Sequence, residues 1–249
     1  MPEPFDKRIA HPCFPQPEDA SRAVWRYMAL PKFVSLLQTS QLYLTRLDLL
    51  NDPHEGSLPR PLVEARDALF EKEGIKHALP HMSGVNQKIR SACYVSCWVL
   101  SDSESEALWR LYTTDNDGIA IQSTYQQLLD IIKKEDELYV GRVNYLDYET
   151  QWFPAGNLFY PVMHKRFAFA HENEIRLVKL LGVHVALDSP PGPPGILAPV
   201  DLEALVQGIY ISPYAQQWYA DVVRSIVEKF VPALAPRIRW SRMKSAPLY

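Results

Sequence analysis

The chain has 249 residues, of which 47% are hydrophobic, 11% aromatic and 22% charged, a composition typical of a folded globule and not of a disordered tail. Lysine and arginine together number 26 against 29 aspartates and glutamates, so the formal net charge is −3. This balance excludes a global basic field of the kind that holds nucleic acid or an anionic membrane.

The cysteines and the N-terminus indicate the compartment. Three cysteines without a repeated spacing are a poor disulfide framework and suggest a reducing environment. Cys93 and Cys97 lie four apart in an apolar stretch, where a strand turns both thiols the same way, so we interpret both as core residues. The first residues lack the basic and apolar regions of a signal peptide. The longest apolar stretch, near 177–187, falls short of the ~20 residues that span a bilayer. We expect a cytoplasmic protein with no membrane partner.

The first hundred residues predict an arm followed by mixed strands and helices. Five prolines in residues 1–20 predict an extended N-terminal arm. Pro31 suits the first turn of a helix, because its fixed backbone angle matches that position. Helical spacing of apolar residues predicts a second helix over 61–73. Apolar segments predict strands over 25–28, 42–45 and 92–99.

The remaining segments continue the mixture. A capping box from Ser103 to Glu106 predicts the start of a helix, and Ser123 can cap the helix that follows a strand over 118–122. Further strands are predicted over 138–146, 172–181, 208–212 and 237–241, and further helices over 158–170, 201–207 and 214–230. The proline- and glycine-rich stretch at 189–199 predicts a loop.

These elements predict an α+β fold. Strands and helices do not alternate as regular strand–helix–strand units, and the sequence has no G-x-G-x-x-G or phosphate-binding loop. We therefore expect a single domain over residues 21–249, with a mixed or mostly antiparallel sheet flanked by helices.

The most unusual segment is Glu172-Asn173-Glu174-Ile175-Arg176, an acidic start that runs into an apolar strand. On a regular strand Glu172 and Glu174 project from one face about 7 Å apart. Their repulsion at an effective dielectric near 20 is about 2.4 kcal/mol, which Lys165 or Arg176 can offset. Paired carboxylates suit the orientation of a ribose hydroxyl or the stabilisation of an oxocarbenium ion. The alternative is a solvated strand entry with a structural salt bridge.

Two earlier segments offer further charged candidates. Asn51-Asp52-Pro53-His54-Glu55 predicts a capped turn, from which Asp52 and Glu55 can also present carboxylates as loop residues often do. Arg26 lies between two aromatic residues on an early strand and needs an anionic partner, which is either Glu174 or a ligand phosphate.

Aromatic residues and histidines complete the candidates. Trp98, Trp109 and Tyr112 either line a pocket or belong to the core. His77 and His81 are four apart, but Pro80 should break the helix that they would need to bind metal together. No metal motif is therefore predicted. The candidate ligand-binding residues are Asn51, Asp52, Glu55, Ser96, Trp98, Trp109, Tyr112, Ser123, Lys165 and Arg176.

In their order and spacing these segments resemble the bacterial family named domain of unknown function 2971, over roughly residues 24 to 245. The matching motifs are Trp25-Arg26-Tyr27, Asn51-Asp52-Pro53-His54-Glu55, Val95-Ser96-Cys97-Trp98, Glu104 to Tyr112, Gly118 to Ile121, Glu172 to Arg176 and Ile209 to Pro213. This resemblance leaves the activity open.

A second resemblance is to the ADP-ribosyltransferase fold. That fold carries an early arginine or histidine, a Ser-Thr-Ser strand and a later Glu-x-Glu. Arg26, Ser123-Thr124 and Glu172-Asn173-Glu174 occur here in that order, although Tyr125 replaces the third residue of the Ser-Thr-Ser element. The resemblance implies that Arg26 clamps NAD, Glu174 stabilises the developing cation and Glu172 orients the acceptor.

Three functional hypotheses follow. The first is an enzyme that processes NAD or another nucleotide, as an ADP-ribosyltransferase or NAD glycohydrolase does, with NAD as substrate. The second is a metal-dependent hydrolase or nuclease that uses Asp52, Glu55, Glu172 and Glu174 around Mg²⁺. The third is a non-catalytic module that senses a ligand or binds a protein partner. The sequence itself shows no strong signal for nucleic-acid binding.

Overall fold

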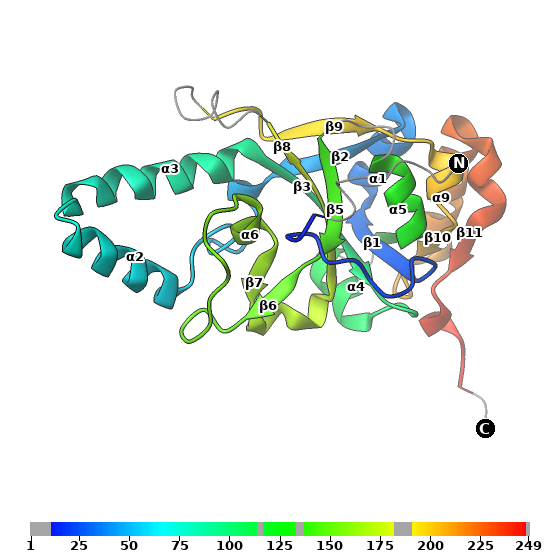
Figure 1. Ribbon diagram of the computed structural model, residues 1–249. Coiled ribbons are helices and arrows are strands. Elements are labelled where there is room, and N and C mark those ends of the chain that lie inside the picture. Colours follow the sequence, from blue (N-terminus) through cyan, green and yellow to red (C-terminus); the bar gives the residue numbers. More distant parts are fainter. Residues whose placement is uncertain (1–10, 114–116, 133–136, 182–190, 248–249) are drawn as a thin grey trace, which may run out of the picture. The chain divides into compact units, whose positions relative to one another are not determined.

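The computed structural model describes residues 11–113, 117–132, 137–181 and 191–247. It is an α+β fold with a mixed, mostly antiparallel sheet and flanking helices, as predicted (Figure 1). The chain divides into two compact units, each built from three separate segments. The first unit contains Leu44–Cys97 and the described parts of Met1–Pro17 and Glu135–Ile196. The second contains Glu18–Tyr43, Leu197–Tyr249 and Trp98–Lys134, again in their described parts.

In the first unit, strand β8 (Glu174–Leu180) pairs with β5 (Leu138–Arg142) and with β3 (Cys93–Leu100). β3 in turn pairs antiparallel with the end of β2 (Gln41–Arg46). A separate parallel pair joins β6 (Asn144–Leu146) to β7 (His164–Arg166). The short helix α6 (Phe159–Val162) precedes β7, and a 3-10 helix (Phe167–Glu172) joins β7 to β8. These elements surround a core to which Phe14, Val95, Phe159 and Val178 belong.

Two longer helices of the first unit form a hairpin, α2 (Arg60–Lys72) and α3 (Leu79–Ala92) (Figure 1). No residue of α2 is buried, and only Ile89 and Ala92 of α3 are. The sequence predicted α2 but not α3. Pro80 lies in the first turn of α3, where its missing N–H costs nothing. His77 lies in a 3-10 helix that ends at Ala78 and His81 lies in α3, so no single helix carries both histidines, as expected, although Pro80 begins a helix instead of ending one.

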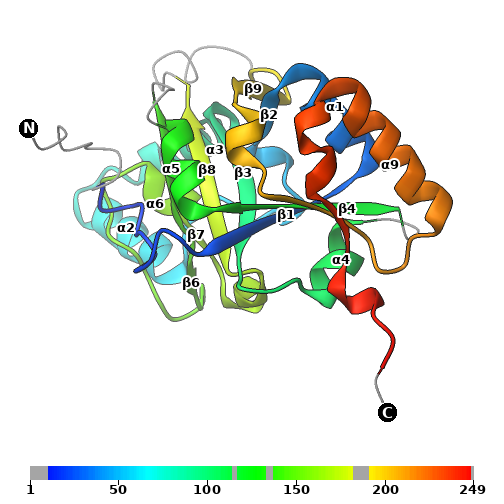
Figure 2. The ribbon, with the colours of Figure 1, turned by 90° about the vertical axis from the view of Figure 1, so that its right-hand side faces the viewer.

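The second unit is built on the strand order β11, β10, β4, β1, with the end of β3 next. These strands are β1 (Ala23–Ala29), β4 (Gly118–Thr124), β10 (Gly208–Ile211) and β11 (Ile238–Trp240). Among these strands of the second unit, the β10–β11 pair is parallel and the other pairs are antiparallel. The helices are α1 (Leu30–Thr39), α4 (Glu106–Tyr112), α5 (Tyr125–Ile132), α8 (Leu202–Leu205) and α9 (Gln217–Phe230). Figure 2 shows α1 and α9 side by side above β1 and β4, with α4 below them.

Two predicted helix starts in the second unit were displaced. Ser105, and not Ser103, is the N-cap of α4, because the Ser105 hydroxyl accepts from the N–H of Leu108. Ser123 is not a cap, since β4 continues through it and α5 begins at Tyr125. The Ser123 hydroxyl instead donates to the Gln127 side chain at 2.9 Å.

The predicted helix over 158–170 was wrong. The chain there forms α6, β7 and a 3-10 helix, because the residues after Val162 pair with β6. Asn144 donates to the carbonyl of Met163 at 2.9 Å, and His164–Arg166 then run parallel to β6. The predicted strand over 138–146 is accordingly split into β5 and β6, where Val143 donates to the carbonyl of Glu174.

Two segments predicted as irregular have more structure than expected. The predicted loop at 189–199 ends in strand β9 (Gly195–Pro199), which lies at the end of the strand order, where proline is tolerated. Residues 182–190 lie outside the described part. In the predicted arm, Phe14 is buried and stacks on Tyr139. A Cβ at Gly141 would lie 2.7 Å from the Phe14 Cα, so this close approach requires glycine. Residues 1–10 of the arm are not described.

Candidate functional site

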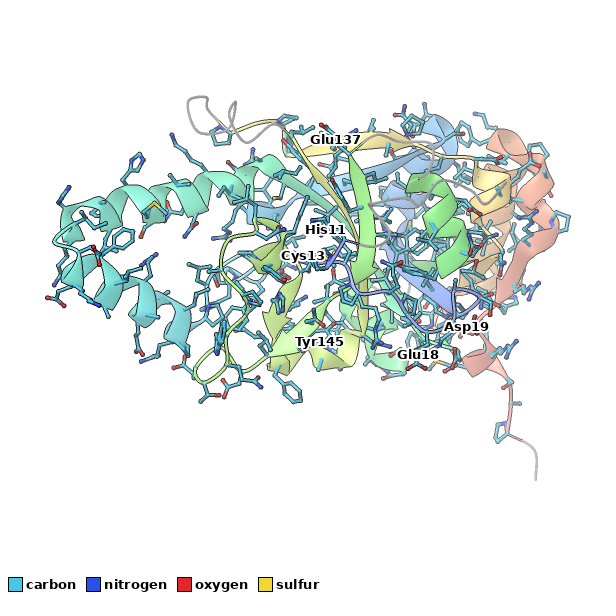
Figure 3. All side chains as sticks on the ribbon, in the orientation of Figure 1. His11, Cys13, Glu18, Asp19, Glu137 and Tyr145 are labelled. Carbon is cyan, nitrogen blue, oxygen red and sulfur yellow. The ribbon has the colours of Figure 1, made fainter. Side chains whose placement is uncertain are left out.

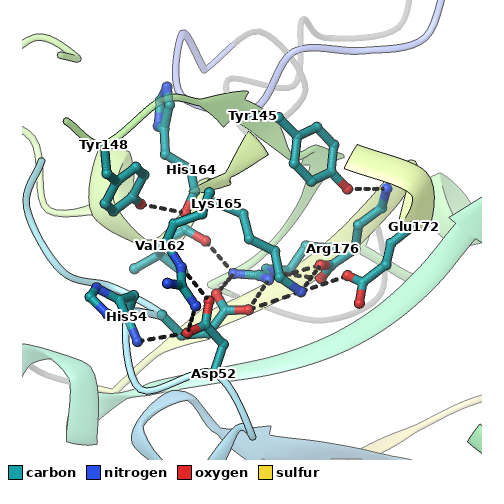
Figure 4. Close-up of polar contacts among 12 residues, drawn as sticks. Asp52, His54, Tyr145, Tyr148, Val162, His164, Lys165, Glu172 and Arg176 are labelled. Atoms are coloured by element: carbon teal, nitrogen blue, oxygen red, sulfur yellow. Dashed lines mark hydrogen bonds and ion pairs between the residues drawn. The ribbon is translucent and has the colours of Figure 1, made fainter. Parts of the chain in front are cut away.

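The first unit holds a buried cluster of five charged side chains, Glu55, Lys165, Glu172, Glu174 and Arg176, which we call the charged cluster (Figure 4). Glu55 comes from the turn after the sequence Asn51-Asp52-Pro53. Lys165 lies on β7, Glu172 ends the 3-10 helix, and Glu174 and Arg176 begin β8. The sequence predicted all five as site residues, and the structure brings them together.

Arg176 is the cation at the centre of the cluster and has no exposed surface. Its Nε lies 2.7 Å from Glu174 Oε1, and its Nη2 lies 2.9 Å from Glu174 Oε2. The same guanidinium reaches Glu55, from Nη1 to Oε2 at 3.1 Å, and donates to the carbonyl of Val162 at 2.6 Å. Arg176 therefore binds two carboxylates and a carbonyl in the fork geometry that arginine favours.

Lys165 joins the third carboxylate to the cluster. Its Nζ lies 2.6 Å from Glu172 Oε2, 3.1 Å from Glu55 Oε1 and 3.5 Å from Glu174 Oε2. The ring of Phe169 lies 4.7 Å from the same ammonium. Burial would lower the pKa of Lys165, but the carboxylates of Glu174 and Glu55 outweigh it and raise that pKa, so the lysine stays charged.

The two carboxylates of the Glu-x-Glu motif converge by a different route from the predicted one. Glu172 lies in the 3-10 helix and not in the strand. Asn173 has φ +40°, in the left-handed region that asparagine tolerates better than most residues. Both carboxylates reach Lys165 across this bend. The prediction that Glu172 and Glu174 project from one face of a regular strand was therefore wrong. The prediction that Lys165 and Arg176 offset their negative charge was confirmed.

Glu174 is held in its ionised form. Burial alone would favour the neutral acid, but Arg176 and then Lys165 outweigh it, so the pKa of Glu174 lies below its ordinary value. The thiol of Cys97 also hydrogen-bonds the carboxylate. Burial and the negative charge of Glu174 raise the pKa of Cys97 well above its usual range. We interpreted Cys97 as a core residue, and the sequence carried no signal of this contact.

A second ion pair lies on the turn that supplies Glu55. Arg166 Nη2 lies 2.8 Å from Asp52 Oδ1, and the same oxygen accepts from the N–H of His54 at 3.0 Å. The carbonyl of Asp52 accepts from the N–H of Glu55. Asp52 is thus buried and fixes the turn, whereas Asn51 is exposed.

The other predicted residues have the following surroundings. Ser96 is buried on β3 in the first unit. Arg26, in the second unit, donates to the carbonyl of Tyr43 at 3.1 Å and lies 5.9 Å from the centre of the Trp98 ring. Trp98 and Trp109 are fully buried, and Trp109 donates to Glu104 Oε2 at 3.1 Å. Tyr112 is 46% exposed. A ligand contact at each of these residues stays a prediction.

No group of three or more histidine, cysteine or acidic side chains in the described residues is arranged to hold a metal ion. Within the same residues, no helix has both the length and the apolar character needed to cross a bilayer.

No protein-family model matches the chain, and no curated protein does. Two solved structures of DarT from Thermus sp. 2.9 are similar to it. One is in complex with NAD⁺ and the other with ADP-ribosylated single-stranded DNA.

Each DarT structure is 12% identical and has a TM-score of 0.43 over 92% of this chain, covering 98% and 97% of the DarT chains. The likeness is weak. It is too low to carry a conclusion about function, which depends on the residues of this chain. The expectation of no strong nucleic-acid signal stays a prediction.

Proposed function

We propose that the chain is an enzyme that cleaves or transfers the ADP-ribosyl group of NAD, with Glu174 as its catalytic carboxylate. The observation that carries this proposal is the buried Glu174, whose neighbours hold it ionised. When the bond between nicotinamide and ribose breaks, positive charge develops on the ribose carbon. A fixed carboxylate in a water-poor site stabilises that charge more than one in water does.

The electrostatics of the charged cluster support this role. Its five side chains comprise three carboxylates and two cations, so a developing positive charge meets carboxylates in formal excess. A proton donor would need the opposite tuning, a carboxyl pKa raised toward neutrality. Glu174 therefore suits charge stabilisation better than general acid catalysis. Glu172, two residues away, is the candidate for orienting the acceptor.

The same geometry disfavours the metal-dependent hydrolase. Lys165 and Arg176 already lie between the carboxylates of Glu55, Glu172 and Glu174, and Arg166 pairs with Asp52. A divalent cation would have to displace these ammonium and guanidinium groups. The residues proposed as magnesium ligands thus already have cationic side chains as partners.

The test is nicotinamide release from NAD by the wild type, Glu174→Gln and a control, Glu149→Gln. Glu149 is exposed and pairs with Arg60. We expect Glu174→Gln to lower kcat at least 10²-fold, the usual cost of losing one transition-state contact, with the Kd for NAD changed only a few-fold. Glu149→Gln should behave as the wild type does.

A thermal shift separates the three hypotheses. NAD at 100 times its Kd adds about 2.7 kcal/mol to stability, whereas Mg²⁺ should add none. Stabilisation by Mg²⁺ alone would favour the hydrolase. The proposal would be refuted if Glu174→Gln released nicotinamide as fast as the wild type does. It would also be refuted if a folded wild type neither released nicotinamide nor was stabilised by NAD.

A further inference from the structure

Tyr145, which is labelled in Figure 3, lies beside the charged cluster in a position that the sequence did not single out (Figure 4). It is the middle residue of β6, and in the parallel β6–β7 pair its Cα partner is Lys165. Its hydroxyl oxygen accepts a hydrogen bond from the backbone N–H of Glu174 at 2.8 Å. The phenol is therefore tied to the residue that carries the proposed chemistry.

The hydroxyl keeps its own proton available. In the bond to Glu174 the oxygen is the acceptor, so the O–H is not used. Among the residues that the structure describes, no group accepts this proton from Tyr145. Burial and then the carboxylate of Glu174 raise the pKa of Tyr145, so the proton stays bound at neutral pH. Tyr145 thus presents a fixed neutral donor beside carboxylates.

The chemistry of this pair selects a hydroxyl as the ligand group. A hydroxyl can donate to a carboxylate and accept from a phenol at the same time, whereas a phosphate can only accept and is repelled by Glu172 and Glu174. We propose that Tyr145 donates a hydrogen bond to a ribose hydroxyl of the substrate while a carboxylate of the charged cluster accepts from that same hydroxyl. This inference deepens the proposed function and rests on it.

Tyr148 provides a matched control. It lies three residues further along the chain, it is buried, and burial raises its pKa as well. Its hydroxyl, however, donates to the carbonyl of His164 at 3.1 Å, so it has no proton left for a ligand. Tyr145→Phe and Tyr148→Phe therefore each remove one phenolic oxygen from the first unit, but only the first removes a donor to substrate.

The experiment is a cycle of two proteins and two substrates. Wild type and Tyr145→Phe are compared on NAD and on NAD whose nicotinamide-side ribose lacks the 2′-hydroxyl. We expect Tyr145→Phe to lower kcat/KM for NAD about tenfold, the effect of one hydrogen bond of ordinary strength. With the deoxy substrate, Tyr145→Phe and wild type should be equal, because the partner of the phenol is already missing. Tyr148→Phe should retain the wild-type preference.

The outcomes separate the inference from the proposed function. If the wild type releases nicotinamide and Tyr145→Phe affects both substrates equally, the proposed function stands and the inference fails, because the phenol then acts only on structure. If the wild type does not use NAD, the proposed function fails, and binding of AMP against 2′-deoxy-AMP decides the inference. The inference is supported if the wild type prefers AMP over 2′-deoxy-AMP and Tyr145→Phe alone abolishes that preference. It is overturned if the wild type binds both nucleotides equally or binds neither.

Discussion

Replacement of Arg176 by methionine tests the charged cluster most directly. Methionine keeps the length and much of the volume of the side chain but removes its charge. The substitution leaves Glu174 and Glu55, both buried, with Lys165 as the cation that they share. It also leaves the carbonyl of Val162 without the donor that reaches it at 2.6 Å.

The expected cost is large because the two carboxylates remain buried after their partner is lost. Removing one member of a buried ion pair costs about 3–5 kcal/mol in the free energy of unfolding. For a chain of this size, each kcal/mol lowers Tm by roughly 2–4 °C, so Tm should fall by about 6–20 °C. The loss should be smaller in acid, because protonation removes the unpaired charges in the variant.

Urea unfolding at pH 7 and pH 4.5 measures both effects. Arg166→Met is the control, since Arg166 also pairs with a buried carboxylate, Asp52, but its side chain is 37% exposed. Its loss should cost less than the loss of Arg176, because Arg166 is partly solvated and Asp52 still accepts from the N–H of His54. If Arg176→Met costs no more than Arg166→Met at pH 7, or if its cost does not shrink in acid, the cluster is not the desolvated ion network described above.

Three further predictions follow from other features. The pKa of Glu174 is lowered on folding, so its ionisation contributes stability above the ordinary glutamate pKa of about 4.3. That stability is lost as the pH falls through the lowered value. Urea midpoints should therefore fall in acid less steeply for Glu174→Gln than for the wild type, and parallel curves would contradict this. Burial raises the pKa of Cys93 to about 12. Its thiol should therefore react with Ellman's reagent at pH 8 only after denaturation. Fast reaction of Cys93 in the native protein would show that this residue is exposed. Ser105→Ala should cost about 0.5–2 kcal/mol by removing the α4 cap, whereas Ser103→Ala should leave the unfolding midpoint unchanged; equal effects would show that Ser105 is not the cap.

The sequence predicted the elements whose local pattern agrees with their final surroundings. The apolar runs of β1, β3 and β10 and the helical periodicity of α1 and α9 are such cases. The helical spacing of residues 158–170 gave a wrong prediction because His164–Arg166 pair with β6, 20 residues back along the chain. Local preference was overridden there by tertiary structure.

The charged cluster was predicted residue by residue but not as an assembly. Glutamates, a lysine and an arginine near an apolar strand are visible in a sequence, and their type alone makes them candidates. Their meeting is not, because Glu55 and Arg176 are 121 residues apart and no periodicity connects them. The contacts of Tyr145 and Cys97 with Glu174 were not predicted, because a tyrosine or cysteine in a strand pattern is most simply interpreted as a core residue.

The separation of Glu55 from Arg176 also has a consequence for biosynthesis. A ribosome that adds about 5–20 residues per second needs roughly 6–24 s to make the 121 residues between them. Throughout that interval the acidic turn exists without the guanidinium that it will bind. The second unit is completed later still, because Leu197–Tyr249 belongs to it. A nascent chain stalled before β8 thus has neither unit complete, and we expect such chains to be the form that chaperones hold and proteases remove.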